Sequence, residues 1–191
     1  MELFSIFFGA ILINNFVLHY FLGICPFLGV SKKIDAATSM GLAVTFVMTI
    51  TAVVSWLVNH WILIPYGLDY LQIVAFILVI ASLVQLVEMF VRKTSPPLYQ
   101  AMGIYLPLIT VNCAIMGLAL LTALKNYDFV EAVVFGVGSG IGFTLAIALM
   151  AAIREQLELA DVPEPLRGAG IALIVAGIMA LAFLGFSGVI K

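Results

Sequence analysis

Six apolar runs, each about long enough to cross a bilayer, take up almost the whole chain. A transmembrane helix needs roughly 20 residues. Only 9% of the 191 residues are charged, against about 25% in soluble domains. The sequence therefore predicts an all-α integral membrane protein with six transmembrane helices. The expected spans are Leu3–Val30, Ala36–Trp61, Leu71–Val91, Tyr99–Leu124, Phe129–Ile153 and Leu166–Ile190.

The connections between these runs are short and leave no room for a soluble domain. We therefore treat residues 1–191 as a single transmembrane domain. Any nucleotide or soluble-carrier chemistry would have to belong to partner chains. The net charge of −2 and the lack of a basic cluster longer than two residues argue against a nucleic-acid partner.

Basic residues are distributed unequally between the two sides of the expected membrane. Six of the eight Lys and Arg residues flank the first, third and fifth connections. Cytoplasmic loops carry an excess of Lys and Arg, so we expect these connections in the cytoplasm and both termini outside. The six residues are Lys32, Lys33, Arg92, Lys93, Arg154 and Arg167.

The first and fourth runs contain residues that a lipid-facing helix tolerates poorly. Pro26 directly follows Cys25, and Pro107 comes six residues before Cys113. Proline removes a backbone donor and disfavours helical geometry at the residue before it. Irregular backbone at membrane depth survives only where it is buried in protein or lines a cavity. We therefore expect two broken, interior segments, the first interrupted at Cys25 and Pro26.

Short matches in the same order indicate that the chain is duplicated. The matched stretches are Cys25–Gly29 with Cys113–Gly117, Gly41–Thr45 with Gly140–Thr144, and Phe76–Ala81 with Ile171–Ala176. We expect two three-helix repeats, at about residues 1–95 and 96–191. They would be inserted with opposite orientations, because each repeat has an odd number of spans. The symmetry then carries Cys25 onto Cys113 and predicts that they meet near the middle of the bilayer.

These two cysteines allow two interpretations. A free cysteine in an apolar run is commonly a small hydrophobic residue. Matched positions on two broken segments instead favour a shared metal site at Cys25 and Cys113. Thiolates select iron–sulfur clusters, zinc or copper over hard cations. Because two thiolates cannot complete a four-cysteine site, we expect a second chain of similar build to supply two more.

Other residues on these and neighbouring runs have simpler explanations. The polar residues Asn14, Asn15, His19, Thr110 and Asn112 lie on the two broken runs. Hydrogen bonding between helices is their more common role, and support of metal ligands is the alternative. The glycines of Gly136–Gly142 lack the spacing of a dinucleotide loop, so we expect them to allow close helix packing.

Longer motifs spread over essentially the whole chain are specific enough to indicate a relationship. They are Asn14-Asn-Phe-Val-Leu18, Phe21-Leu-Gly-Ile-Cys-Pro-Phe-Leu-Gly-Val-Ser-Lys-Lys33, Arg92-Lys-Thr-Ser-Pro96, Leu106-Pro-Leu-Ile-Thr-Val-Asn-Cys113, Ala152-Ile-Arg-Glu155 and Asp161-Val-Pro163. Together they resemble the RnfA/NqrE family of membrane subunits, and its Rnf branch in particular.

The resemblance implies a subunit of the Rnf complex, a redox-driven translocase of the prokaryotic plasma (inner) membrane. That complex moves electrons between ferredoxin and NAD and couples this flow to transport of Na⁺ or H⁺. A homologous E-type subunit of inverted orientation would share a [2Fe-2S] centre with this chain, held on this side by Cys25 and Cys113. The flavins and the nucleotide site would lie on other Rnf subunits.

The alternative function is a small secondary transporter or ion channel, because inverted three-helix repeats recur in transporters. The broken segments would then bind a substrate or ion, and the cysteines would be incidental. The shortage of charge inside the apolar runs and the pairing of the two thiols argue against this alternative.

Overall fold

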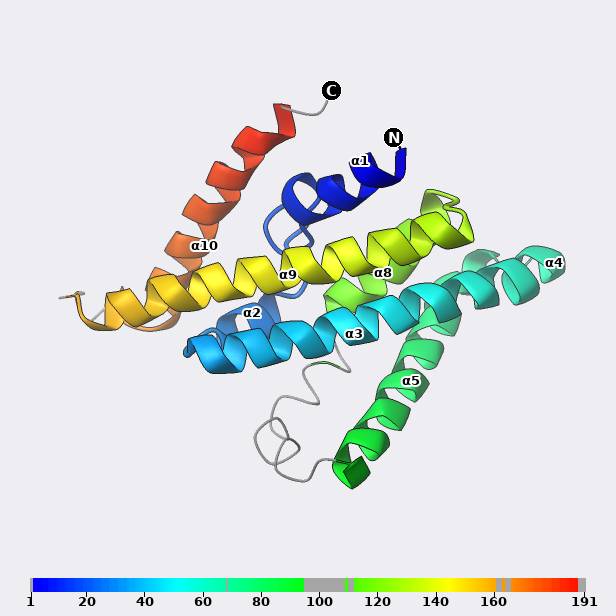
Figure 1. Cartoon of the computed structure of the whole chain (residues 1–191), viewed down its shortest axis with the longest axis horizontal. Coiled ribbons are helices and arrows are strands. Elements are labelled where there is room, and N and C mark those ends of the chain that lie inside the picture. The colour runs from blue at the N-terminus through cyan, green and yellow to red at the C-terminus, as the bar shows by residue number, and fades with distance from the viewer. Residues whose placement is uncertain are drawn as a thin grey trace.

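The computed structural model describes residues 2–67, 69–94, 109, 112–160, 163 and 166–188. Across these residues the chain consists of helices and irregular connections, with no strand. Figure 1 shows two long helices side by side, α3 (Ile34–Val58) and α9 (Phe129–Glu158), with shorter helices around them. The all-α class predicted from the sequence is confirmed.

The remaining described elements surround this central pair. Helix α1 (Glu2–Phe8) continues as the π-helical turn η1 (Gly9–Ile13), and irregular chain then leads to the short helix α2 (Ile24–Val30). Helix α3 continues through a second π-helical turn. The later elements are η2 (Asn59–Leu63), α4 (Ile64–Tyr66), η3 (Asp69–Leu71), α5 (Gln72–Thr94), α8 (Cys113–Leu124), α10 (Ala169–Leu184) and η5 (Gly185–Gly188).

Helices α3 and α9 run antiparallel and touch through small residues. A Cβ atom added to Gly41 would lie 2.6 Å from Thr144 Cγ2, and one added to Gly140 would lie 2.7 Å from Thr45 Cα. The hydroxyl oxygens of the two threonines lie 3.1 Å apart. Each hydroxyl also donates to the carbonyl of the glycine four residues earlier in its own helix. The two glycines therefore let the helix backbones approach closely.

Helix α9 presents glycines on two of its faces. Gly136 and Gly140 face α3, whereas Gly138 and Gly142 face α1 and η1. Backbone oxygens of that N-terminal segment would lie 3.1 Å from a Cβ on Gly138 and 3.0 Å from a Cβ on Gly142. The prediction that these glycines serve close helix packing is confirmed.

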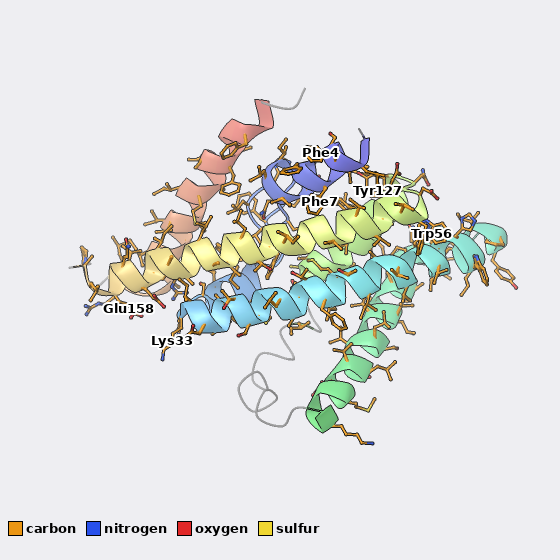
Figure 2. The ribbon with its side chains drawn as sticks, in the orientation of Figure 1. Phe4, Phe7, Lys33, Trp56, Tyr127 and Glu158 are labelled. Carbon is orange, nitrogen blue, oxygen red and sulfur yellow. The ribbon has the colours of Figure 1, made fainter. Side chains whose placement is uncertain are left out.

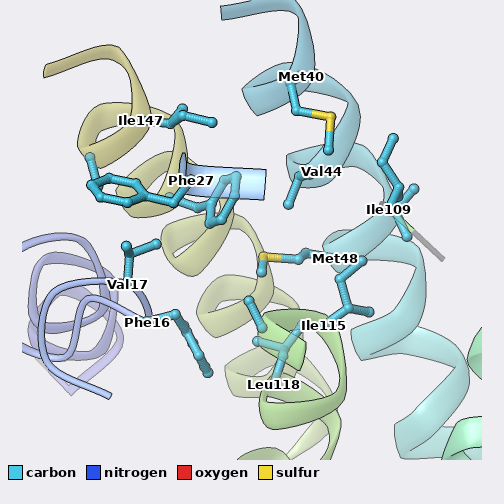
Figure 3. Close-up of a cluster of buried hydrophobic side chains, with 14 of the residues drawn as sticks. Phe16, Val17, Phe27, Met40, Val44, Met48, Ile109, Ile115, Leu118 and Ile147 are labelled. Atoms are coloured by element: carbon cyan, nitrogen blue, oxygen red, sulfur yellow. The ribbon is translucent and has the colours of Figure 1, made fainter. Parts of the chain in front are cut away.

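The core lies between the central pair, α8 and the irregular stretch after η1. Figure 3 shows Phe16 from that stretch together with Met48 of α3, Ile115 and Leu118 of α8 and Ile147 of α9. All five side chains are fully buried. The first part of the irregular stretch, residues 15–18, is therefore buried in protein, whereas residues 19–21 are exposed.

Six described helices are apolar, but their lengths differ. Ile34–Tyr66, Gln72–Met89 and Phe129–Glu158 are long and apolar enough to cross a membrane, and Leu3–Ile13, Cys113–Leu124 and Ala169–Leu184 are shorter. The first predicted span differs most from its helix, which ends at Ile13, and the helix of the second span continues to Tyr66. Pro107 and most of the fourth predicted span before Asn112 lie outside the described residues. The count of six spans and their inverted arrangement stay predictions.

The two ends of the central pair differ in chemistry. Figure 2 shows Lys33 and Glu158 at one end and Trp56 and Tyr127 at the other. Trp56 Nε1 donates to the Tyr127 carbonyl at 3.0 Å, and the Trp56 ring stacks on His60 with centroids 4.9 Å apart. Aromatic residues at helix ends and basic residues near one membrane surface are typical of helices that cross a bilayer, and we call the end with Lys33 and Glu158 the charged end.

Candidate metal centre

The first predicted span is broken between residues 14 and 23, and one buried amide organises the break. Asn15 is fully buried, and its Nδ2 donates to the carbonyls of Ile11 at 3.1 Å and Gly142 at 2.8 Å. Its Oδ1 accepts from the backbone N–H groups of Val17 at 3.1 Å and Leu18 at 3.4 Å. Asn15 thus supplies partners to backbone groups that a helix would otherwise pair.

The other polar residues of this run take less part in the structure. The side chain of Asn14 is half-buried and forms no hydrogen bond within the described part of the chain. His19 is exposed, and its ring meets the Tyr20 ring edge-on with centroids 4.9 Å apart. Thr110 lies outside the described residues. Of the polar residues on the two broken runs that the structure describes, Asn15 and Asn112 form hydrogen bonds through their side chains.

Cys25 and Pro26 both lie in the first turn of α2, so the prediction that they interrupt the run is wrong. The helix begins at Ile24, after the irregular stretch, and its N-cap is Gly23. The first turn of a helix is the place where a missing proline N–H costs nothing, because those N–H groups have no intrahelical partner. Pro26 therefore helps to begin α2 and leaves Cys25 in helical geometry.

Gly23 is held in a conformation and a space that suit only glycine. Its φ is +84°, a left-handed value that other residues adopt at a cost. A Cβ at this position would lie 2.9 Å from Phe143 Cε2, 3.2 Å from Ala114 Cβ and 3.2 Å from Asn112 Oδ1. The start of α2 therefore packs directly against the start of α8.

A hydrogen bond joins these two helix starts. Cys113 is the first residue of α8, and the Oδ1 atom of its neighbour Asn112 caps the helix by accepting from Ala114 N at 3.1 Å. The backbone N–H of Gly23 donates to Cys113 Sγ at 2.9 Å. Cys25 follows Gly23 by two residues, and both cysteines are free and exposed.

The other end of α2 is fixed by residues that the sequence did not single out as part of the site. Arg154 Nη1 donates to the Leu28 carbonyl at 2.8 Å and to Ser31 Oγ at 3.0 Å. Glu155 Oε1 accepts from Ile34 N, the first N–H of α3, at 3.0 Å. The only signal in the sequence was the adjacency of this Arg and Glu in a family motif. Together they hold the turn that follows α2.

The described residues offer two soft donors for a metal. No group of three or more Cys, His, Asp or Glu that could hold a metal occurs among the described residues, so Cys25 and Cys113 are the available soft ligands. Beside Cys113, the Nδ2 of Asn112 is buried and finds no hydrogen-bond partner in the described structure. A buried donor without a partner is costly unless another group satisfies it.

Comparison with known proteins places the chain in a family. Residues 3–190 match the family model described as "Rnf-Nqr subunit, membrane protein". Proteins named as the A-type subunit of an "Ion-translocating oxidoreductase complex" are similar over nearly their whole length. The one from Shigella flexneri is 58% identical over 186 residues, which cover 97% of this chain and 96% of the relative. The one from Photorhabdus laumondii is 56% identical over 190 residues, covering 100% and 98%. The resemblance found from the motifs is confirmed, and the chain belongs to the Rnf-Nqr family of membrane subunits.

Proposed function

We propose that the chain is a membrane subunit of an ion-translocating oxidoreductase complex and carries electrons within the bilayer. We further propose that Cys25 and Cys113 hold one side of a [2Fe-2S] centre, which a homologous subunit completes. The name shared by the similar proteins supports the first part. The observation that carries the second part is the hydrogen bond from Gly23 N to Cys113 Sγ at 2.9 Å, which ties together the helix starts bearing the two cysteines.

The residues at the two helix starts fit such a centre. Cys25 and Cys113 lie in the first turns of α2 and α8, where free N–H groups and the helix dipole favour a negatively charged ligand. Both thiols are exposed, so a second chain can reach a group bound to them. The described residues offer two soft ligands, and a [2Fe-2S] cluster usually takes four cysteines. The missing pair therefore comes from the partner.

Residues next to the cysteines have supporting roles in this proposal. The N–H of Gly23 donates to Cys113 Sγ, and the unpartnered Nδ2 of Asn112 is available to a sulfur atom of the site. Hydrogen bonds to sulfur ligands and solvent exclusion tune the reduction potential of iron–sulfur sites. When bound, a centre of this type accepts and releases one electron. The chain's own contribution is to orient both thiolates and to donate hydrogen bonds to them.

Reciprocal contacts at the centre of the molecule support the proposed duplication. Gly41 packs on Thr144 and Gly140 packs on Thr45, and these are the residues matched between the halves at about 1–95 and 96–191. A two-fold axis in the membrane plane would exchange the two contacts. A partner of the same family but inverted orientation could then present its own two cysteines to Cys25 and Cys113.

The partners and the transported ion in this proposal are those that the resemblance to the Rnf branch implies. In this proposal electrons pass between ferredoxin and NAD, whose sites, like the flavins, lie on other subunits, and Na⁺ or H⁺ moves across the plasma membrane. Both termini lie outside, because six of eight basic residues flank the odd-numbered connections. A reporter that works only in the cytoplasm should therefore be silent when fused after Lys191.

The proposal is tested by iron analysis and EPR spectroscopy of the purified complex. We expect Cys25→Ser and Cys113→Ser, each alone, to abolish the signal of the shared centre and electron flow, because serine is a hard and weakly acidic ligand. Met116→Leu is the matched control. It removes the sulfur of a half-buried residue one turn after Cys113 and should leave the signal unchanged. Full iron content and turnover in an assembled Cys25→Ser/Cys113→Ser complex would contradict the proposal and favour the transporter alternative.

A further inference from the structure

A cleft of about 460 Å³ opens at the charged end of the molecule, where α9 ends and α10 begins. Its volume falls within the roughly 300–1,000 Å³ of small-molecule sites. It lies at the end marked by Glu158 in Figure 2, and its described lining includes neither cysteine. The lining residues are Arg154, Leu157, Glu158, Arg167, Gly168 and Ile171.

Two guanidinium groups give this cleft a positive lining. Arg154 uses Nη1 for the Leu28 carbonyl and Ser31 Oγ, which leaves its other N–H groups free to donate. Arg167 is exposed. Neither guanidinium forms an ion pair with a carboxylate of the described residues, and Glu158 is the acidic residue among the lining residues that the structure describes. An arginine without a carboxylate partner can bind a phosphate with two parallel hydrogen bonds.

The cleft continues into an apolar strip on α10. Ile174 and Ile178 come three and seven residues after Ile171, so all three lie on one face of the helix. Ile174 is 48% exposed and Ile178 is 61% exposed. In a membrane subunit, such exposed side chains face lipid chains or a partner. A charged pocket at the head of an apolar strip matches the two halves of a phospholipid.

We propose that this cleft binds the headgroup phosphate of an anionic phospholipid, with Arg167 and Arg154 as its ligands and the acyl chains along α10. Basic pockets between helices near a membrane surface recognise anionic headgroups in this way. A soluble anion would use the two arginines but gain nothing from Ile174 and Ile178. The inference does not depend on the iron–sulfur proposal, because no residue of the cleft is a ligand of that centre.

The test uses the whole purified complex in phosphatidylcholine nanodiscs that contain a trace of photoactivatable phosphatidylglycerol. After irradiation, mass spectrometry measures probe attached to peptides covering residues 157–174. We expect Arg167→Gln to lower this labelling about five-fold, the effect of one basic residue at an anionic surface, and Arg167→Lys to retain most of it. Lys125→Gln is the matched control, since Lys125 is an exposed cation outside the cleft. Arg154 is left unchanged, because it also holds the turn after α2.

Competition separates the possible occupants. Unlabelled phosphatidylglycerol should displace the probe, and inorganic phosphate should not. Equal competition by inorganic phosphate would replace the proposal with a soluble-anion site. Equal labelling by a phosphatidylcholine probe, or unchanged labelling in Arg167→Gln, would overturn it. Loss of another subunit from the Arg167→Gln complex with unchanged labelling would show that the cleft docks a protein.

Discussion

The two helices that carry the cysteines begin in different ways. Helix α8 begins after Asn112, whose side chain caps the N–H of Ala114, two residues ahead. Helix α2 begins after Gly23, which has no side chain for capping and a φ of +84°. The N–H of Gly23 is instead directed at Cys113 Sγ, 90 residues away in the sequence. The start of α8 is therefore determined by a residue next to it in the chain, whereas the start of α2 is determined by contacts with residues distant in the sequence.

This difference determines how much change each start tolerates. A cap acceptor can be supplied by Ser, Thr, Asp or Asn, so several residues could begin α8. The position of Gly23 excludes any side chain, because Phe143 and Ala114 occupy the space. The break before α2 further depends on Asn15 and its bond to Gly142 of α9. We therefore expect substitutions at the start of α2 and in the break before it to cost more stability than substitutions at the start of α8.

The largest effect is expected for Gly23→Ala. The left-handed backbone costs alanine about 1–2 kcal/mol, and the crowding by buried Phe143 adds about 1–3 kcal/mol. Gly67→Ala is the matched control, since Gly67 also has a positive φ but nothing within 4 Å of its Cβ position. The measurement is denaturant unfolding of the purified full chain in micelles, followed by circular dichroism. Equal losses in the two variants would show that the contact with α8 is unimportant.

Asn15→Ala should be the next most damaging change. It leaves the Gly142 carbonyl and the N–H groups of Val17 and Leu18 without their side-chain partner. Buried groups left unpaired cost about 1–3 kcal/mol. Asn14→Ala is the neighbouring control and should change the free energy of unfolding by less than about 0.5 kcal/mol. Similar values for the two asparagines in the same unfolding experiment would contradict the assignment of the break to Asn15.

Asn112→Ala should have a smaller effect, because it removes one capping bond. The expected loss is about 1 kcal/mol, and the change also removes a buried Nδ2 that lacks a described partner. Asn112→Ser retains a cap acceptor and should restore most of the lost stability. If Asn112→Ala destabilised the chain as much as Gly23→Ala in these unfolding measurements, the two starts would not differ as described.

The smallest effect is expected at the far end of α2. Ser31→Ala removes one of two acceptors for Arg154 Nη1, and the Leu28 carbonyl remains. We expect a loss of about 0.5 kcal/mol in the free energy of unfolding. Ser39→Ala is the control, since the exposed Ser39 hydroxyl bonds only within α3, to the Asp35 carbonyl. A loss above that of Asn112→Ala would mean that the turn after α2 matters more than the capped start of α8.

Much of the fold and part of the candidate site follow from the sequence alone. The apolar runs predict an all-α membrane protein, because low charge and run length are properties of the chain itself. The glycine spacing of Gly136–Gly142 predicts close packing on α9. The motifs identify the family and single out Cys25 and Cys113. Each of these signals lies in residues close together in the sequence.

Tertiary structure alone decides where the first run is broken and what holds it. From neighbours in the chain, Pro26 looks like the interruption, but the break lies at residues 14–23 because Asn15 finds the Gly142 carbonyl on α9. The need for glycine at position 23 comes from Phe143 and Ala114, and the end of α2 is held by Arg154. Hydropathy and propensity depend on adjacent residues. Buried hydrogen bonds and excluded volume depend on which distant atoms the fold brings together.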